Sequence, residues 1–95
     1  MPEPSPSSPA VRIYTTTFCA YCVCAKMLLG KRDIPYEEIN VGGDDQKRAW
    51  LVDVTRRKTV PQIFIHGQPI GGFEELAALD REGKLMPMIA AGPVA

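Results

Sequence analysis

This chain has few cysteines, no long apolar run and no excess of charge of either sign. Its three cysteines lie together at positions 19, 22 and 24, so they cannot form a disulfide framework that links distant segments. We therefore expect a reducing, cytoplasmic environment. No stretch approaches the roughly eighteen apolar residues of a membrane-spanning helix, which argues against a membrane protein.

The charges balance, with eleven basic and eleven acidic residues. A neutral chain has no overall field that attracts nucleic acid or an anionic membrane surface. The basic run Arg56-Arg57-Lys58 is interpreted as a solvated loop, because a nucleic-acid patch would need more positive charge with aromatic side chains nearby. Thiols, either small or carried by proteins, fit better as partners.

The 95 residues allow one domain with a modest hydrophobic core. A proline- and serine-rich start without an apolar core predicts a disordered tail over residues 1–10. Residues 91–95 are expected to be frayed. The folded domain is therefore expected at residues 11–90.

Alternating and helical patterns divide this domain into elements in the order β-α-β-α-β-β-α. We expect strands at 11–15, 36–41, 62–65 and 68–70, helices at 22–31, 45–54 and 73–80, and a last helical turn at 85–90. The first two strands flank a helix, which predicts a parallel pair joined by a right-handed crossover. The last two flank His66-Gly67, a hairpin turn. The fold class is α/β, a four-stranded mixed sheet with helices on both faces.

Spacing also predicts the positions of several side chains. Val23 and Met27, with Leu28 beside them, recur at three- and four-residue spacing and are expected to face the sheet. Cys24 is expected to be a small buried hydrophobe. Trp50 is interpreted as a partly buried packing residue and His66 as a solvated turn residue.

The pair Cys19 and Cys22 offers the clearest chemistry. It lies where a strand gives way to a helix, with Cys19 at or just before the helix start and Cys22 one turn later. Unpaired backbone N–H groups and the positive end of the helix dipole favour a thiolate there. Such a pair can close and reopen a small disulfide ring, which suits electron exchange better than structural bracing.

Two more motifs accompany this pair, Thr59-Val60-Pro61 before a strand and Gly71-Gly72 before an acidic helix start. With Cys19-Ala20-Tyr21-Cys22, they make the chain resemble a small, bacterial-type dithiol glutaredoxin of the thioredoxin superfamily, from about Val11 to about Ile89. The resemblance implies a thioredoxin-like fold. It also implies a glutathione-dependent oxidoreductase that reduces protein disulfides and glutathione mixed disulfides.

The resemblance further implies where glutathione would bind. Pro61 would follow a cis peptide bond and face the cysteines, which leaves the backbone of Val60 to pair with the cysteinyl part of the tripeptide. The start of the third helix would hold the γ-glutamyl end, and one of Arg56, Arg57 or Lys58 would attract the glycyl carboxylate. The implied glutathione-binding residues are Tyr21, Arg57, Thr59, Val60, Pro61, Gly72, Phe73, Glu74 and Glu75.

In the mechanism that the resemblance implies, Cys19 attacks a mixed disulfide and becomes glutathionylated. A second glutathione then resolves the intermediate, or Cys22 does so when the substrate is a protein disulfide. The expected partners are glutathione and proteins that carry a disulfide or a bound glutathione. The protein without a cofactor is expected to be a monomer.

The chain departs from the commonest glutaredoxin pattern, because Ala20 replaces a proline and Thr16 replaces a lysine. Some family members without that proline hold a [2Fe–2S] cluster between two protomers. The alternative function is therefore a glutathione-ligated [2Fe–2S] homodimer for cluster storage, transfer or sensing, with Cys19 as the protein ligand. A zinc site made of Cys19, Cys22, Cys24 and His66 is disfavoured, because Cys-x-Cys along a helix converges poorly on one metal.

Overall fold

The structure, a computed structural model, describes residues 9–91 of the chain. The tail expected at 1–10 and the fraying expected at 91–95 therefore fall almost entirely outside the described residues. The elements are β1 (Val11–Thr15), α1 (Ala20–Lys31), β2 (Tyr36–Asn40), α2 (Asp45–Thr55), β3 (Gln62–Ile65), β4 (Gln68–Gly71), α3 (Phe73–Arg81) and α4 (Leu85–Ala90). No helix within 9–91 has the length and apolar character needed to cross a membrane.

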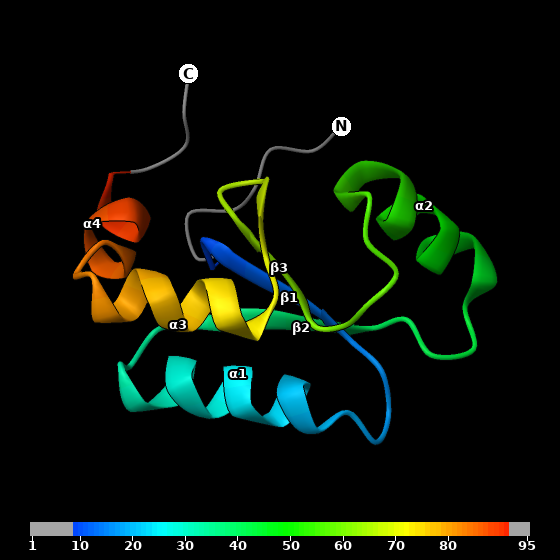
Figure 1. The fold of residues 1–95 in the computed structure, drawn as a ribbon, viewed down its shortest axis with the longest axis horizontal. Helices are drawn as coiled ribbons and strands as arrows, with labels where there is room; N and C mark the ends of the chain where they lie inside the picture. The colour runs from blue at the N-terminus through cyan, green and yellow to red at the C-terminus, as the bar shows by residue number, and fades with distance from the viewer. Residues whose placement is uncertain (1–8, 92–95) are drawn as a thin grey trace.

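The four strands form one mixed sheet in the order β2-β1-β3-β4 (Figure 1). β1 and β2 are parallel, as a crossover through α1 requires, whereas β3 is antiparallel to both β1 and β4. β3 and β4 are joined through His66-Gly67, where both residues have positive φ, 51° and 81°. The predicted four-stranded mixed sheet is confirmed.

Helices cover both faces of this sheet. On one face, α1, α3 and α4 pack on side chains of β1 and β3 to form the larger core, with Ile13, Leu29, Ile63, Leu76 and Leu85 almost completely buried. On the other face, Leu51 of α2 packs with Tyr14, Val41 and Phe64. β1 and β3 are the central strands, with a hydrophobic core on each face of the sheet.

The face of α1 that packs on the sheet differs from the prediction. The buried residues are Cys22, Ala25 and Leu29, whereas Val23 and Met27 are 50% and 68% exposed. The prediction that these two residues face the sheet was wrong, and so was the prediction that Cys24 is buried, since its side chain is exposed. α1 is apolar on almost every side, so its sequence shows no contrast that would identify the packed face.

The structure confirms the prediction for Trp50 and contradicts the one for His66. Trp50 is 45% exposed yet stacks on Phe64, with ring centroids 6.1 Å apart, which confirms a partly buried packing role. His66 is half-buried, and its Nε2 lies 2.8 Å from the carbonyl oxygen of Ile89. It is therefore not the solvated turn residue that was predicted.

Candidate functional site

Cys19 caps the N-terminus of α1. Its backbone is extended (φ −111°, ψ 108°), and its Sγ accepts a hydrogen bond from the backbone N–H of Cys22 at 3.1 Å. The helix thus begins at Ala20, two residues before its predicted start. Cys19 and Cys22 are joined as a disulfide with their Cα atoms 5.2 Å apart. Cys19 is half-exposed and Cys22 is only 2% exposed, so an incoming molecule can reach Cys19 alone.

The surroundings of Cys19 favour its thiolate form after reduction. The first turn of α1 contains no acidic residue that would oppose a negative sulfur. The N–H of Cys22 and the positive end of the helix dipole both point at Sγ. These features make Cys19 the candidate nucleophilic sulfur of the site.

The peptide bond between Val60 and Pro61 is cis, as the resemblance implied. It brings the carbonyl oxygen of Val60 to 3.7 Å from Sγ of Cys19, across a separation of 41 residues. Gln62 steadies the segment, because its Nε2 donates a hydrogen bond to the carbonyl of Thr59 at 2.8 Å. The segment Thr59-Val60-Pro61 therefore lies beside the sulfur of Cys19.

The start of α3 forms the far side of the site. Oε1 of Glu75 accepts hydrogen bonds from the backbone N–H of Gly72 at 2.6 Å and from Nη1 of Arg57 at 2.7 Å. These two donors, the Gly72 N–H first and Arg57 second, lower the pKa of Glu75 from its ordinary value. Gly71 has φ 116°, and a Cβ there would overlap the Glu75 side chain. The glycine therefore makes room for the carboxylate that caps the helix.

The site residues implied by the resemblance lie together. They line a shallow groove of about 280 Å³ that runs from the N-terminus of α1 past the cis-proline segment to the N-terminus of α3. The rings of Tyr21 and Phe73 are 6.4 Å apart at its α1 side. The complete lining is Tyr21, Arg57, Thr59, Val60, Pro61, Gly72, Phe73, Glu74 and Glu75.

A larger hollow of about 400 Å³ lies elsewhere, between α2 and β2, and is lined by Tyr14, Ile39, Asp44, Gln46, Lys47 and Trp50. None of these residues is a thiol or belongs to the cis-proline segment. We therefore place the candidate functional site at the smaller groove, because of these two hollows it is the one that adjoins Cys19 through Val60.

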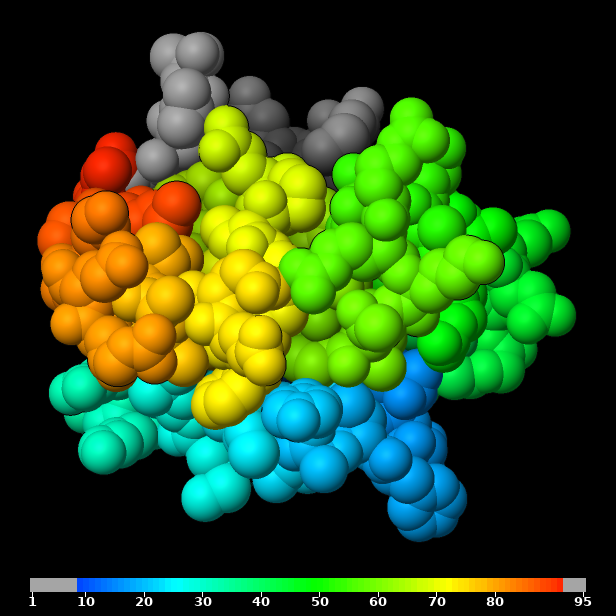
Figure 2. All heavy atoms as spheres, viewed as in Figure 1, coloured from blue at the N-terminus to red at the C-terminus, as the bar shows by residue number. Residues whose placement is uncertain are grey.

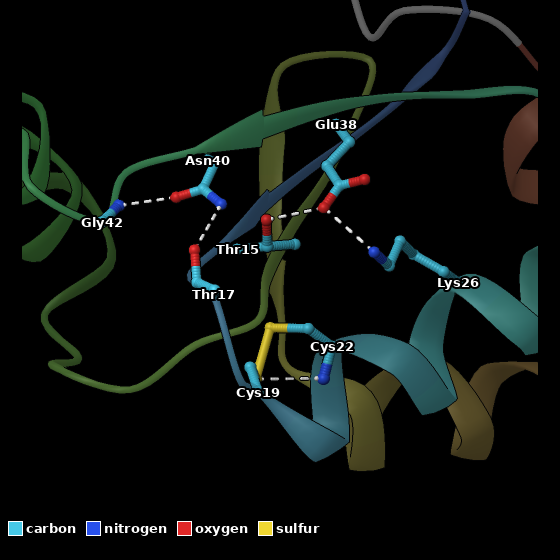
Figure 3. A network of polar contacts seen from close by, with 8 residues as sticks. All are labelled: Thr15, Thr17, Cys19, Cys22, Lys26, Glu38, Asn40 and Gly42. Atoms are coloured by element: carbon cyan, nitrogen blue, oxygen red, sulfur yellow. Dashed lines mark hydrogen bonds and ion pairs between the residues drawn. A yellow bond between two sulfur atoms is a disulfide. The ribbon is translucent and has the colours of Figure 1, made fainter.

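A polar cluster that lies above the disulfide in Figure 3 was not identified from the sequence. Oε2 of Glu38 accepts hydrogen bonds from Oγ1 of Thr15 at 2.8 Å and from Nζ of Lys26 at 3.1 Å. Thr15 first and Lys26 second lower the pKa of Glu38. Lys26 lies one helical turn after Cys22, so the cluster ties α1 to the edge strand β2. Only the register of the sheet brings these residues together, and no local motif marks them.

The loop between β1 and α1 is held by a second set of contacts in the same view (Figure 3). Asn40 donates a hydrogen bond from Nδ2 to Oγ1 of Thr17 at 3.3 Å and accepts one from the N–H of Gly42 at 2.8 Å. These bonds link the loop that carries Cys19 to the end of β2.

A half-exposed sulfur at a helix N-terminus, paired with a buried one and facing a cis-proline, is the arrangement of a thiol-disulfide oxidoreductase with a thioredoxin-like fold. The model of the Glutaredoxin family matches residues 11–70. Glutaredoxin 3 of Escherichia coli K12 is 43% identical over 79 residues, which cover 83% of this chain and 95% of that protein. The glutaredoxin of Pseudomonas aeruginosa is 42% identical over 83 residues, covering 87% and 99%. The chain therefore belongs to the glutaredoxin family.

Solved structures agree with this assignment. The solution structure of glutaredoxin from Brucella melitensis superposes with a TM-score of 0.80 at 37% identity, covering 96% of this chain and 100% of that one. A crystal structure of a buckwheat glutaredoxin–glutathione complex has a TM-score of 0.81 at 30% identity, covering 87% and 78%.

Proposed function

We propose that the protein is a glutathione-dependent oxidoreductase that reduces protein disulfides and glutathione mixed disulfides through Cys19 and Cys22. The observation that carries this proposal is the position of the Cys19 sulfur, 3.7 Å from the Val60 carbonyl at the edge of the groove. A peptide thiol that pairs with the Val60 backbone would present its own sulfur to Cys19. The related buckwheat protein, solved as a glutathione complex, supports glutathione as that peptide.

The groove offers a separate contact for each of the three charged groups of glutathione. Backbone N–H groups at the start of α3 suit the γ-glutamyl carboxylate. Glu74 is exposed and has no ion-pair partner among residues 9–91, so it is free to accept the ammonium group. Glu75 is already engaged by Gly72 and Arg57 and acts mainly to hold the groove together. The guanidinium of Arg57 retains further donors for the glycyl carboxylate.

The reaction follows from the unequal exposure of the two sulfurs. The Cys19 thiolate attacks the glutathione sulfur of a mixed disulfide, forms a Cys19–glutathione disulfide and expels the substrate as a thiolate. A second glutathione thiolate attacks that glutathione sulfur, so that oxidised glutathione leaves and the Cys19 thiolate is restored. For a protein disulfide, Cys19 forms a mixed disulfide with the substrate. The nearby Cys22 then displaces the reduced protein, and two glutathione molecules reduce the resulting Cys19–Cys22 disulfide.

Separate cysteine variants test this division of work in a glutathione-coupled assay. Cys19→Ser should abolish turnover of both a glutathione mixed disulfide and a protein disulfide. Cys22→Ser should retain turnover of the mixed disulfide, because a second glutathione can replace it. Cys24→Ser is the matched control for the mixed disulfide and should retain that activity, since Cys24 is exposed outside the groove. An inactive but folded Cys22→Ser protein would contradict the assignment of Cys19 as the sulfur that attacks the mixed disulfide.

The alternative of a [2Fe–2S]-bridged homodimer stays a prediction and rests on Ala20, which stands at the first position of α1 where the commonest glutaredoxin pattern has proline. In each chain, Cys19 would be the protein ligand of such a cluster, and a bound glutathione would be the second ligand. Anaerobic reconstitution should then give a brown dimer, and Cys19→Ser should remain colourless. A colourless monomer from the wild-type chain would count against this alternative.

A further inference from the structure

The outward face of α1 is apolar although no other described element covers it. Ala20, Val23, Cys24 and Met27 recur at three- and four-residue spacing on the side opposite the buried residues, and Phe18 precedes them in the loop. Phe18 is fully exposed, and Met27 and Val23 are 68% and 50% exposed. We call these five residues the α1 stripe. A surface helix normally presents polar side chains there, and a contiguous exposed apolar patch marks an interaction surface.

The α1 stripe is continuous with the reactive sulfur. Phe18 and Ala20 are the immediate neighbours of Cys19 in the chain, while Tyr21 turns toward Phe73 and the groove. Cys19 thus adjoins the groove through Val60 and the α1 stripe through its chain neighbours Phe18 and Ala20. Helix α1 forms the lower rim of the molecule in the view of Figures 1 and 2, with the sheet and the other helices above it.

We propose that the α1 stripe is the docking surface for the polypeptide of a protein substrate, where it binds apolar side chains that flank the substrate's reactive cysteine. This inference rests on the proposed function. When the glutathione part of a glutathionylated protein occupies the groove, the protein part must leave Cys19 by another side. The α1 stripe is the apolar surface that begins at that point.

The dimensions and charge of the α1 stripe define the substrate segment. From Ala20 to Met27 the helix rises about 10 Å, which matches about three residues of extended chain. No charged side chain lies on this face until Lys31 at the end of the helix. The preferred substrate therefore carries apolar residues within about three positions of its cysteine, rather than charged ones.

Two glutathionylated octapeptides test the proposal. They share one central cysteine and one net charge, but one has leucine and phenylalanine beside the cysteine and the other has serine and glycine. The wild-type protein should turn over the apolar peptide with a kcat/KM about tenfold higher, a ratio typical of burying one or two apolar side chains. The double variant Val23→Gln, Met27→Gln should reduce that preference to within about twofold. Both changes keep the net charge and good helix propensity.

Two controls make the outcome specific. Met86→Gln changes a methionine of α4 that is 51% exposed, and it should keep the wild-type preference. The small mixed disulfide of glutathione and 2-mercaptoethanol should be reduced equally by all three proteins. If the wild-type protein does not reduce this small mixed disulfide, the proposed function itself is refuted.

Two results would overturn the docking surface alone, provided that turnover of the small disulfide is normal. One is that the wild-type protein shows no preference between the peptides. The other is that the preference survives in the double variant. Sedimentation of the wild-type protein completes the test. A dimer that the double variant dissociates would show that a second copy covers the α1 stripe, and this result would also overturn the proposal.

Discussion

Glu75 offers a sharp test of how the groove is held together. Its carboxylate accepts one hydrogen bond from the Gly72 N–H, at the start of α3, and one from Arg57 in the loop before β3. Glu75→Gln keeps an oxygen that can accept from Gly72 but removes the charge that both bonds use. Glu74→Gln is the matched control, because it removes an equal charge from the same helical turn and leaves the ion pair between Arg57 and Glu75 in place.

The expected loss of stability is modest. Arg57 and Glu75 are 45% and 39% exposed, so solvent screening limits their ion pair to at most about 1 kcal/mol. Weakening the bond to Gly72 from charge-assisted to neutral adds a few tenths of a kcal/mol. The helix-dipole contribution is common to both variants and cancels between them. Glu75→Gln should therefore be about 1 kcal/mol less stable than Glu74→Gln, a difference of about 4–8 °C in Tm for a domain of this size.

The pH dependence has a definite sign. The folded state lowers the pKa of Glu75 below its ordinary value of 4.5, so the stabilisation by its charge is fully present above that value. The stabilisation is lost as the pH falls through the lower, folded-state pKa. Urea denaturation of both variants at pH 7 and in acid measures the difference. Equal stabilities at pH 7, or a gap that persists undiminished in strong acid, would refute the reasoning.

Glu74→Gln should raise the KM for glutathione about tenfold, because the ammonium group loses a charged partner, and a steady-state titration of glutathione that leaves KM unchanged would contradict this role. Gly71→Ala should lower the free energy of unfolding by about 1–3 kcal/mol, since φ is 116° and its Cβ would displace Glu75; urea denaturation measures it. Leu29→Ala empties a fully buried site and should cost about 2–5 kcal/mol in the same assay. Glu38→Gln should cost less than about 1 kcal/mol, because its pairing with Lys26 is partly exposed, and this cost should be lost as the pH falls through the folded-state pKa of Glu38, which is lowered from its ordinary value.

Much of the fold and of the groove could be predicted because their signals are local. The cysteine pair, the segment Thr59-Val60-Pro61 and the glycine pair before α3 each occupy consecutive positions. Backbone conformation at such motifs depends on near neighbours, such as the cis bond before Pro61 and the positive φ of Gly71. The order of strands and helices likewise follows from periodicity within short windows.

Other predictions failed where the local signal was ambiguous. α1 is apolar on nearly every side, so Val23 and Met27 looked as suitable for the core as Ala25 and Leu29. The choice depends on which side of the helix meets β1, β3 and α3. The same is true of Cys24, whose exposure follows from that choice.

The sequence by itself determined the order of elements, the reactive cysteine pair and the motifs that build the groove, because each depends on residues close together in the chain. Only the tertiary structure decided that Glu75 pairs with Arg57, 18 positions away, and that Glu38 pairs with Thr15, 23 positions away. It also decided that no other element within residues 9–91 covers an apolar helix face beside Cys19. Contacts of this kind depend on strand register and helix packing, which are set by the summed burial of the whole core rather than by a pattern in any one segment.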